Sequence, residues 1–169
     1  FDKGELLTPA WVYQVVSDAS QRIGTAGIGL IFSGSPRTMY EAFGDELHDG
    51  LVKELVGYYG KENIFVFYLK VNPEISIFRN SRRLVCSICG RPALYFDHQE
   101  PLQCGFCAGS LRKRSLDKSE IIKERLVVFK RDTLPIIDEF RKREYNVVEV
   151  NGDRKPFEVF QEILEKLKS

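Results

Sequence analysis

Residues 29–38 read Gly-Leu-Ile-Phe-Ser-Gly-Ser-Pro-Arg-Thr, a short apolar run followed by a loop rich in Gly, Ser and Pro. A run of this kind, bounded by turn residues, is typical of a buried strand that ends in a tight loop. Two further apolar runs, at 64–69 and 146–150, have the same character, and helical patterns lie between the runs. Strands that alternate with helices predict an α/β fold, with a three-layer arrangement of a parallel sheet and helices on both faces.

Capping and proline signals predict where the helices begin and end. We expect an amphipathic helix within 1–27, a helix over 39–58, another over 73–83, and a long helical region from residue 117 onward. The expected boundary signals are Thr8-Pro9, Asn72 as N-cap with Pro73 at the first helical position, Asp117 and Glu120 as a cap pair, Pro135 as a kink or end, and Pro156 to Leu167 for the last helix.

The overall composition excludes several classes of protein. With 43% hydrophobic residues in 169, the chain can bury a core, which excludes a disordered or collagen-like chain. Its 25 Lys+Arg and 24 Asp+Glu give a net charge of +1, which disfavours a strongly electrostatic nucleic-acid binder. No apolar stretch is long enough to span a membrane or resembles a signal peptide, so we expect a cytoplasmic protein. The only Met is Met39, so the chain is expected to be a fragment or a processed product.

All four cysteines lie in residues 84–116, a Cys-, Gly- and Pro-rich stretch that interrupts the strand and helix pattern. They form Cys86-x-x-Cys89 and Cys104-x-x-Cys107, and fourteen residues separate the pairs. Each pair can offer two sulfurs to one metal through a tight turn, for which Gly90 and Gly109 are suited. We therefore expect a separate small insert that binds one structural Zn²⁺ through four thiolates.

Three other uses of the cysteines remain open from the sequence. Two disulfides are disfavoured in a cytosolic chain, and a thioredoxin-like redox pair needs only one Cys-x-x-Cys. A four-sulfur iron centre would use the same ligands as zinc. His98 lies in the same stretch, but four cysteines already complete a tetrahedral site, so we expect it to be a surface residue.

Several arginines occupy unusual places. Arg125 falls on the apolar side of its predicted helix, near Ile122 and Leu126, where its charge needs an anion or a carboxylate unless the head of the side chain reaches water. Others follow the first apolar run or flank the cysteine stretch, and together they are suited to binding phosphate oxygens. These are Arg37, Arg82, Arg83, Arg112 and Arg114.

In this order, the motifs resemble those of the adenylate kinase family over essentially the whole chain. Residues 29–38 resemble its monophosphate-binding segment, an apolar strand followed by Asp-Gly-Phe-Pro-Arg-Thr, and residues 4–8 resemble the preceding Gly-x-Leu-Val-x stretch. Arg82-Arg83 before Cys-x-x-Cys-Gly is similar to the start of the zinc-bearing lid of many bacterial members. Arg114 and Arg125, eleven residues apart, match two phosphate-gripping arginines, and residues 151–155 resemble the loop near the ATP adenine.

The resemblance implies a P-loop nucleoside monophosphate kinase-like fold with a zinc-ribbon lid, and the reaction ATP + AMP ⇌ 2 ADP with Mg²⁺. Its partners would be the small nucleotides ATP, AMP and ADP, with no nucleic acid and no membrane, and the protein would be a monomer. Its segments would be the remainder of the monophosphate-binding domain at 1–27, the core at 28–83 and 117–169, and the zinc-binding lid at 84–116.

The resemblance also implies roles for individual residues. The expected AMP contacts are Glu5, Leu6, Leu7, Gly34, Ser35, Arg37 and Glu41, with Arg114 and Arg125 on the phosphate. The expected ATP contacts are Arg82, Leu94, Tyr95 and Arg154, with Arg79 a weaker candidate because its spacing to Arg82-Arg83 is one residue short. The expected catalytic residues are Arg82, Arg114 and Arg125, and the expected metal ligands are Cys86, Cys89, Cys104 and Cys107.

The sequence departs from the family pattern at four points. Ser33 replaces an Asp that helps to organise the magnesium shell, and Ser35 replaces an aromatic residue. Glu41 stands where an amide reads the AMP base, and an ionised carboxylate can only accept hydrogen bonds. The sequence contains no Gly-x-x-x-x-Gly-Lys-[Ser/Thr] phosphate loop, so we expect no useful kinase activity from this chain by itself.

Three alternatives to an adenylate kinase remain at this point. Glu41 leaves open a kinase for another nucleoside monophosphate, such as UMP or CMP. Ser33 and the missing phosphate loop are also compatible with an inactive relative. A zinc-ribbon module could instead hold nucleic acid through the basic residues that flank the cysteines, although the net charge and the strand and helix frame argue against it.

Overall fold

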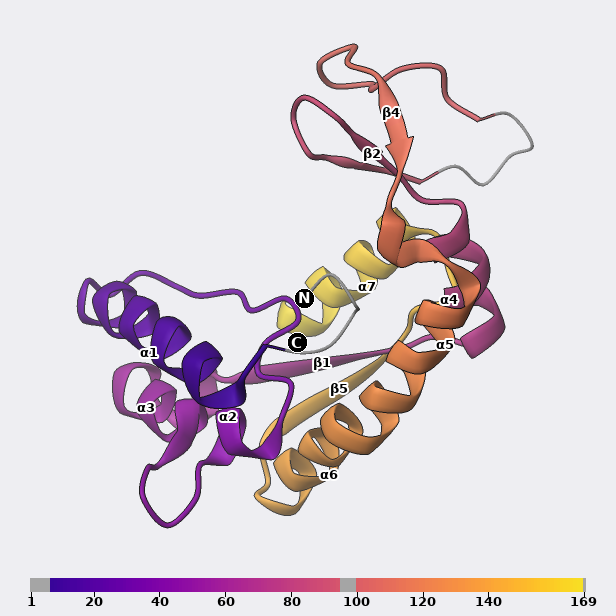
Figure 1. Cartoon of the computed structure of the whole chain (residues 1–169). Coiled ribbons are helices and arrows are strands. Elements are labelled where there is room, and N and C mark those ends of the chain that lie inside the picture. The colour runs from indigo at the N-terminus through magenta and orange to yellow at the C-terminus, as the bar shows by residue number, and fades with distance from the viewer. Residues whose placement is uncertain (1–6, 95–99, 169) are drawn as a thin grey trace. The chain divides into compact units, whose positions relative to one another are not determined.

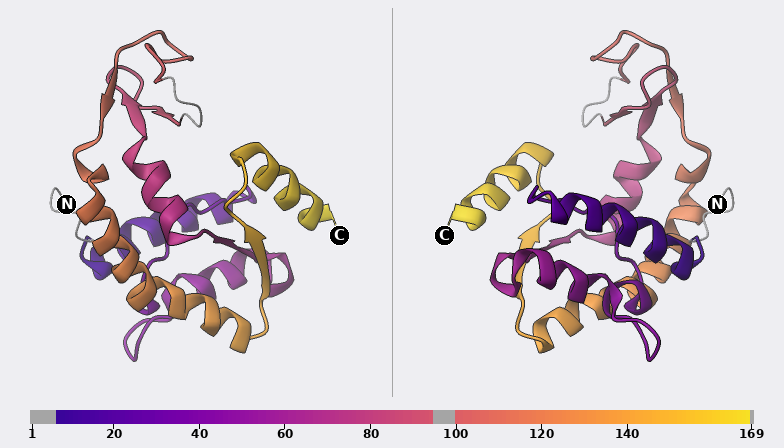
Figure 2. Two further views of the ribbon diagram at one scale, coloured as in Figure 1. Left: turned by 90° about the vertical axis from the view of Figure 1, so that its right-hand side faces the viewer. Right: turned by 90° about the vertical axis from the view of Figure 1, so that its left-hand side faces the viewer.

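The computed structural model describes residues 7–94 and 100–168, which divide into two compact units. The first unit contains residues 7–70 and 127–168, and the second contains residues 71–126. Figures 1 and 2 show the elements of both units, which are described separately below.

The first unit is built on a pair of parallel strands, β1 (Phe65–Lys70) and β5 (Asn146–Asn151), in register from Phe65 beside Asn146 to Lys70 beside Asn151. Its helical elements are α1 (Pro9–Thr25), α2 (Met39–Phe43), α3 (Gly50–Tyr59), the 3₁₀ turn η1 (Lys61–Asn63), the π-helical turn η3 (Phe129–Thr133), α6 (Leu134–Lys142) and α7 (Pro156–Lys168). Helices α6 and α7 flank the strand pair (Figure 1), as the sequence pattern predicts for a parallel sheet.

The core of the first unit lies where α2, α3 and α6 meet. Ala42, Val52, Ile136 and Phe140 are buried there. Partly buried side chains that pack against this core include Phe43 of α2, whose ring lies 5.0 Å from that of Phe140. Val150, on β5, is fully buried, and Val159, on α7, is nearly so. Helices α2, α3 and α6 therefore share one cluster of buried apolar side chains, while β5 and α7 each contribute a further buried valine.

The second unit contains α4 (Pro73–Ser81), a three-stranded antiparallel sheet and most of α5 (Ser119–Val128). The sheet has the order β3 (Pro92–Ala93), β2 (Leu84–Cys86), β4 (Leu111–Lys113), and the 3₁₀ turn η2 (Ser115–Asp117) follows it. At its base, the Arg83 guanidinium donates two hydrogen bonds to the Asp117 carboxylate, one of them 2.9 Å long from Nε to Oδ2. Asp117 is 4% exposed, so this ion pair is largely shielded from water.

Replacing Asp117 by Ala is expected to destabilise the second unit by about 3 kcal/mol, because it leaves the partly buried Arg83 without its carboxylate. Urea unfolding, followed by amide signals of residues 71–126, measures the change. The matched control is Asp138→Ala, which removes an exposed ion pair with Arg141 and should cost no more than about 0.5 kcal/mol. Equal losses in the two variants would contradict the prediction.

The structure confirms the strands predicted at 64–69 and 146–150 and the last helix. It also confirms Asn72 as an N-cap, because the Asn72 side chain accepts a hydrogen bond from the Glu74 N–H.

Three predictions were wrong. No strand forms at 29–32, because no strand among the described residues pairs with it, and Ile31 is 98% exposed. The helix expected over 39–58 is interrupted after Phe43, where Asp45 accepts hydrogen bonds from the N–H groups of Leu47 and His48.

The third wrong prediction is the cap pair at Asp117 and Glu120. Helix α5 begins at Ser119, and the Asp117 carboxylate binds Arg83 instead. The break expected at Pro135 takes the form of the π-helical turn η3, which ends two residues before this proline.

Within the described part of the chain, no helix combines the length and the apolar character that crossing a membrane requires.

Candidate functional site

The four cysteine sulfurs of the second unit lie together, all within 4.8 Å of one another. The Sγ atoms of Cys86 and Cys107 are 3.5 Å apart, and those of Cys89 and Cys104 are 3.7 Å apart. Sulfurs that bind one tetrahedral Zn²⁺ at about 2.3 Å are separated by about 3.8 Å, whereas a disulfide bond measures about 2.0 Å. The spacing therefore fits one shared metal ion and does not fit two disulfides.

Two similar turns hold these sulfurs. In the first, the Gly90 N–H donates to the Cys86 carbonyl and the Cys86 N–H donates to the Arg91 carbonyl. In the second, the Ala108 N–H donates to the Cys104 carbonyl, and the Cys104 N–H donates to the Gly109 carbonyl. The same pair of hydrogen bonds thus recurs around each Cys-x-x-Cys, and both turns direct their sulfurs to one point.

Backbone N–H groups favour the thiolate form of two of the sulfurs, those of Cys86 and Cys104. Hydrogen bonds from the N–H groups of Cys89 and Ile88 lower the pKa of Cys86 to about 6. The N–H groups of Cys107 and Phe106 likewise lower the pKa of Cys104. Because Zn²⁺ binds the deprotonated sulfur, these hydrogen bonds favour the form that the metal needs. The donor set and its surroundings therefore fit a structural zinc ion.

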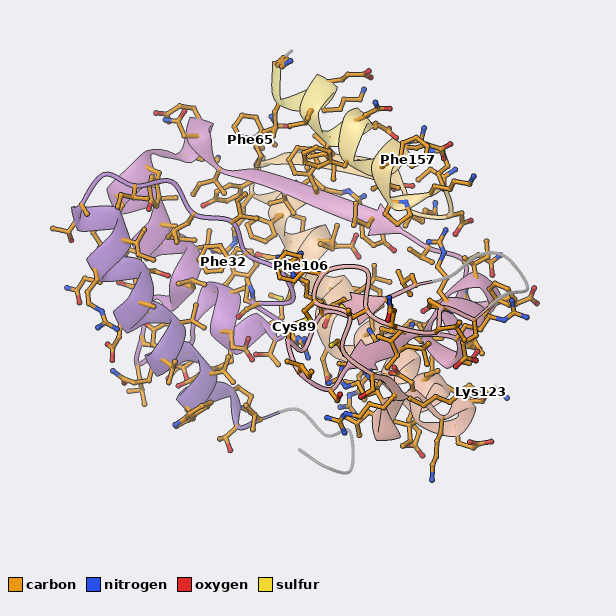
Figure 3. The ribbon with its side chains drawn as sticks, turned by 90° about the horizontal axis from the view of Figure 1, so that it is seen from above. Phe32, Phe65, Cys89, Phe106, Lys123 and Phe157 are labelled. Carbon is orange, nitrogen blue, oxygen red and sulfur yellow. The ribbon has the colours of Figure 1, made fainter. Side chains whose placement is uncertain are left out.

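The two turns also contact each other through side chains. The Arg91 guanidinium lies 3.7 Å from the centre of the Phe106 ring, a cation–π contact between residues that each belong to one turn. Figure 3 labels Cys89 and Phe106 in this segment. A Cβ placed on Gly109 would lie 3.0 Å from the Cys86 sulfur, so a larger residue would require the sulfur to shift. Gly109 therefore allows close packing against the sulfur, in addition to the turn that the sequence suggested.

Ala108 takes the left-handed backbone conformation that Gly90 takes in the first turn, with φ values of +57° and +70°. This conformation strains a residue with a Cβ by roughly 1–2 kcal/mol. We expect Ala108→Gly to tighten zinc binding about fivefold, because part of that strain is removed at the expense of some chain entropy. Gly90→Ala should weaken it by a similar factor. Competition with a chromophoric chelator measures both variants, and equal affinities would contradict the prediction.

In the first unit, residues 33–38 form a turn around Arg37. The Arg37 guanidinium folds back so that its Nε donates to the Gly34 carbonyl, and the side chain remains exposed. A Cβ on Gly34 would lie 2.9 Å from the guanidinium, so a larger residue would displace it. The turn thus presents a positive charge, in a defined position, at the residue where the sequence predicts a monophosphate contact.

Glu41 begins α2 together with Thr38. The Thr38 hydroxyl accepts the Glu41 N–H at 3.2 Å and donates to Glu41 Oε1 at 3.1 Å. The other carboxylate oxygen, Oε2, accepts the Arg37 N–H at 2.8 Å. Glu41 is 4% exposed, so its carboxylate is enclosed by the chain that it caps.

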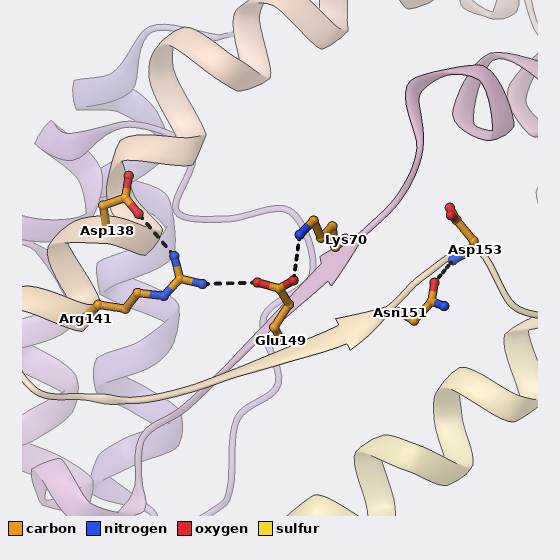
Figure 4. Close-up of polar contacts among 6 residues, drawn as sticks. All are labelled: Lys70, Asp138, Arg141, Glu149, Asn151 and Asp153. Carbon is orange, nitrogen blue, oxygen red and sulfur yellow. Dashed lines mark hydrogen bonds and ion pairs between the residues drawn. The ribbon is translucent and has the colours of Figure 1, made fainter.

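The carboxyl ends of β1 and β5 form a second polar region of the first unit. Glu149 accepts a 2.9 Å contact from Lys70 Nζ, and its other oxygen lies 3.4 Å from Arg141 (Figure 4). Beyond the end of β5, the Asn151 side chain accepts the Asp153 N–H at 3.0 Å. Next to this loop lies an open groove of about 720 Å³, lined by Asn151, Arg154, Glu158, Gln161, Glu162, Glu165 and Lys166.

The other predicted site residues are distributed between the units. Leu7 and Arg154 belong to the first unit, and Arg154 pairs with Glu162 in the wall of the groove. Arg79, Arg82, Leu94, Arg114 and Arg125 belong to the second unit. Arg82 lies 4.4 Å over the Phe78 ring, and Arg125 is exposed rather than buried in the apolar side of its helix. Glu5, Leu6, Tyr95 and His98 lie outside the described residues.

Two contributors to these sites were missed by the sequence reasoning. Asp117 was assigned to a helix cap, and its role as the partner of Arg83 has no local signal because 34 residues separate them. Thr133 donates a 3.0 Å hydrogen bond from its hydroxyl to the Arg37 carbonyl across 96 residues of sequence. A contact of this kind depends on tertiary structure. The only sequence signal nearby was Pro135, which predicted a kink or an end of the helix.

No protein-family model matches the chain, but many curated proteins do. Over 173 residues it is 34% identical to the adenylate kinase of Archaeoglobus fulgidus, which covers 99% of the chain and 76% of that protein. Over 169 residues it is 33% identical to the adenylate kinase of Mycoplasma mycoides, covering 98% and 74%. The adenylate kinase of Mycoplasma capricolum is 36% identical over 143 residues, covering 82% of the chain and 63% of that protein. The chain thus spans between 63% and 76% of the length of these relatives.

Proposed function

The chain belongs to the adenylate kinase family, and on this basis we propose that it serves reversible phosphoryl transfer between nucleoside phosphates, ATP + AMP ⇌ 2 ADP. In this reaction an oxygen of the AMP phosphate forms a bond to the γ-phosphorus of ATP, while the bond from that phosphorus to the departing ADP breaks. The protein's task is to position the two nucleotides and to neutralise their charge, because no covalent intermediate with the protein is needed. Mg²⁺ enters with ATP as part of the substrate.

The observation that carries the proposal is the Arg37 turn. Its guanidinium is exposed, fixed through Nε on the Gly34 carbonyl, and follows the Ser-Gly-Ser-Pro motif that resembles the family's monophosphate segment. A planar guanidinium matches the oxygens of a phosphate. We propose that Arg37 binds the AMP phosphate with Arg114 and Arg125, and that the remaining contacts to AMP come from Glu5, Leu6, Leu7, Gly34 and Ser35.

The groove beside α7 is the proposed place for the ATP base. It adjoins the loop at the carboxyl end of β5, where ligands of parallel sheets usually bind. Its wall includes Arg154, the residue predicted from the resemblance. Arg82, Leu94 and Tyr95 are proposed to contact ATP from the second unit. Ser33 would offer magnesium-bound water a hydroxyl in place of a carboxylate, and a hydroxyl is the weaker acceptor of the two.

We propose that residues 84–116 act as a lid that closes over bound nucleotide and excludes water, so that ATP is not hydrolysed. Cys86, Cys89, Cys104 and Cys107 would hold a zinc ion that stabilises this segment. Four protein ligands fill a tetrahedral site, so this metal has no position for a substrate.

Replacing Arg37 by Ala tests the phosphate contact. The affinity for AMP should fall about tenfold to a hundredfold, because one charge-assisted contact is lost, whereas adenosine, which has no phosphate, should bind unchanged. Isothermal titration of the 169-residue chain measures both. The control is Arg22→Ala, which also removes one exposed charge, since Arg22 contacts only its own helix through Nε in the described contacts. An equal loss for AMP and adenosine, or no loss for AMP, would contradict the proposal.

A further inference from the structure

Both ends of the Arg37 residue are tied to the rest of the first unit. Its backbone N–H donates to Glu41 Oε2 at 2.8 Å, and its carbonyl accepts the Thr133 hydroxyl at 3.0 Å. Its side chain is tied to the Gly34 carbonyl. Three hydrogen bonds thus hold this residue, and its guanidinium is the group proposed above to meet the phosphate.

Both oxygens of the Glu41 carboxylate accept a hydrogen bond in this arrangement. Oε2 takes the Arg37 N–H, and Oε1 takes the Thr38 hydroxyl at 3.1 Å. The residue is 4% exposed, so a nucleotide base could reach it only after these hydrogen bonds were broken. The resemblance assigns the base contact to this position, but the geometry supports a different role.

The Thr133 hydroxyl that reaches Arg37 belongs to the π-helical turn that precedes α6. π turns occur mostly as single turns inside α-helices, and they are frequent at functional sites. Thr133 is the last residue of the turn η3 (Phe129–Thr133), and Pro135 follows at the second position of α6. The π-helical turn therefore contains the hydroxyl that donates to the Arg37 carbonyl.

We propose that Glu41 and Thr133 are positioning residues for Arg37, which hold its peptide groups so that its guanidinium meets the monophosphate, and that Glu41 does not read the base. The inference rests on the proposed function, since it requires Arg37 to contact a phosphate. It predicts that changes at Glu41 or Thr133 alter affinity for the phosphate of a nucleotide and leave the choice of base unchanged.

The test compares AMP, adenosine and GMP binding to the 169-residue chain and its variants by isothermal titration. Glu41→Ala should weaken AMP about three- to tenfold, as expected for the loss of one hydrogen bond to a group that aligns a charge, with adenosine and the AMP-to-GMP ratio unchanged. Glu41→Gln keeps an acceptor for the Arg37 N–H and should restore AMP affinity to within about twofold. Thr133→Val should also weaken AMP about threefold, and Thr133→Ser should restore it.

Loss of adenosine affinity in Glu41→Ala, or a changed AMP-to-GMP ratio, would show that Glu41 reads the base and would overturn the inference. If Arg37→Ala weakens AMP and Glu41→Ala does not, the inference fails while the proposed function stands. If Arg37→Ala has no effect, both fall. Because Glu41 also caps α2, thermal melting checks that each variant is folded, and Thr133→Val tests the same idea at a residue outside that cap.

Discussion

Removing zinc from the chain is expected to unfold the segment that bears the cysteines. Between Leu84 and Lys113 the described strands are only two or three residues long, and few of the described side chains in this range are buried, chiefly those of Leu84, Cys86 and Cys104. Structural zinc contributes roughly 10–16 kcal/mol to the folding of zinc-finger peptides, far more than so small an apolar cluster can supply. The metal-free segment should therefore lose its hydrogen-bonded sheet.

Amide hydrogen exchange with and without a chelator measures this effect. Protection of the β2 and β4 amides should disappear when zinc is removed, whereas the amides of β1 and β5, in the other unit, serve as an internal control and should keep theirs. Metal analysis should find about one zinc per chain, and Cys104→Ser should lower the affinity sharply. Protection that survives chelation, or a coloured protein that contains iron, would contradict the expectation.

The 169-residue chain, assayed by itself, is expected to form ADP from ATP and AMP at least about a thousandfold more slowly than ordinary kinases, which turn over roughly 1–100 times per second. Its sequence contains no Gly-x-x-x-x-Gly-Lys-[Ser/Thr] loop. Such a loop supplies several backbone N–H groups and a lysine to the transferred phosphates, and the loss of even one preorganised donor can cost about 10²–10³ in rate.

A coupled assay of ADP formation tests this, with the adenylate kinase of Archaeoglobus fulgidus assayed in parallel as an active relative. AMP binding by the same preparation shows that the chain is folded and that the monophosphate site is intact. Turnover at an ordinary kinase rate would refute the prediction, and would mean that other residues of the chain neutralise the transferred phosphate.

The sequence predicts elements well where local signals agree with the tertiary environment. The apolar runs at 65–70 and 146–151 pair with each other, so each run has a partner and forms a strand. The run at 29–32 has equal strand character, but pairing is a property of two segments, and none of the described strands lies in register with it. A local pattern could not reveal that difference.

The candidate sites show the same division. The spacing of each Cys-x-x-Cys pair is enough to predict how its two sulfurs are placed, because a turn within six residues closes each pair. In the structure the four sulfurs do come together. The contacts of Arg37 with Thr133, and of Arg83 with Asp117, join residues that are 96 and 34 positions apart. No local spacing encodes such contacts, so the sequence could suggest that Arg37 is functional but not what holds it.

The ion pair between Arg83 and Asp117 also bears on how this family can vary. Together with the pairing of Leu84 with Lys113, it brings the start and the end of the cysteine-bearing segment to one place in the second unit. A segment whose ends already meet can be lengthened, shortened or replaced at a cost set mainly by loop-closure entropy, which grows only slowly with length. We therefore expect that residues 84–116 can be exchanged, so that a metal-free sequence with the same end-to-end distance could be grafted in their place.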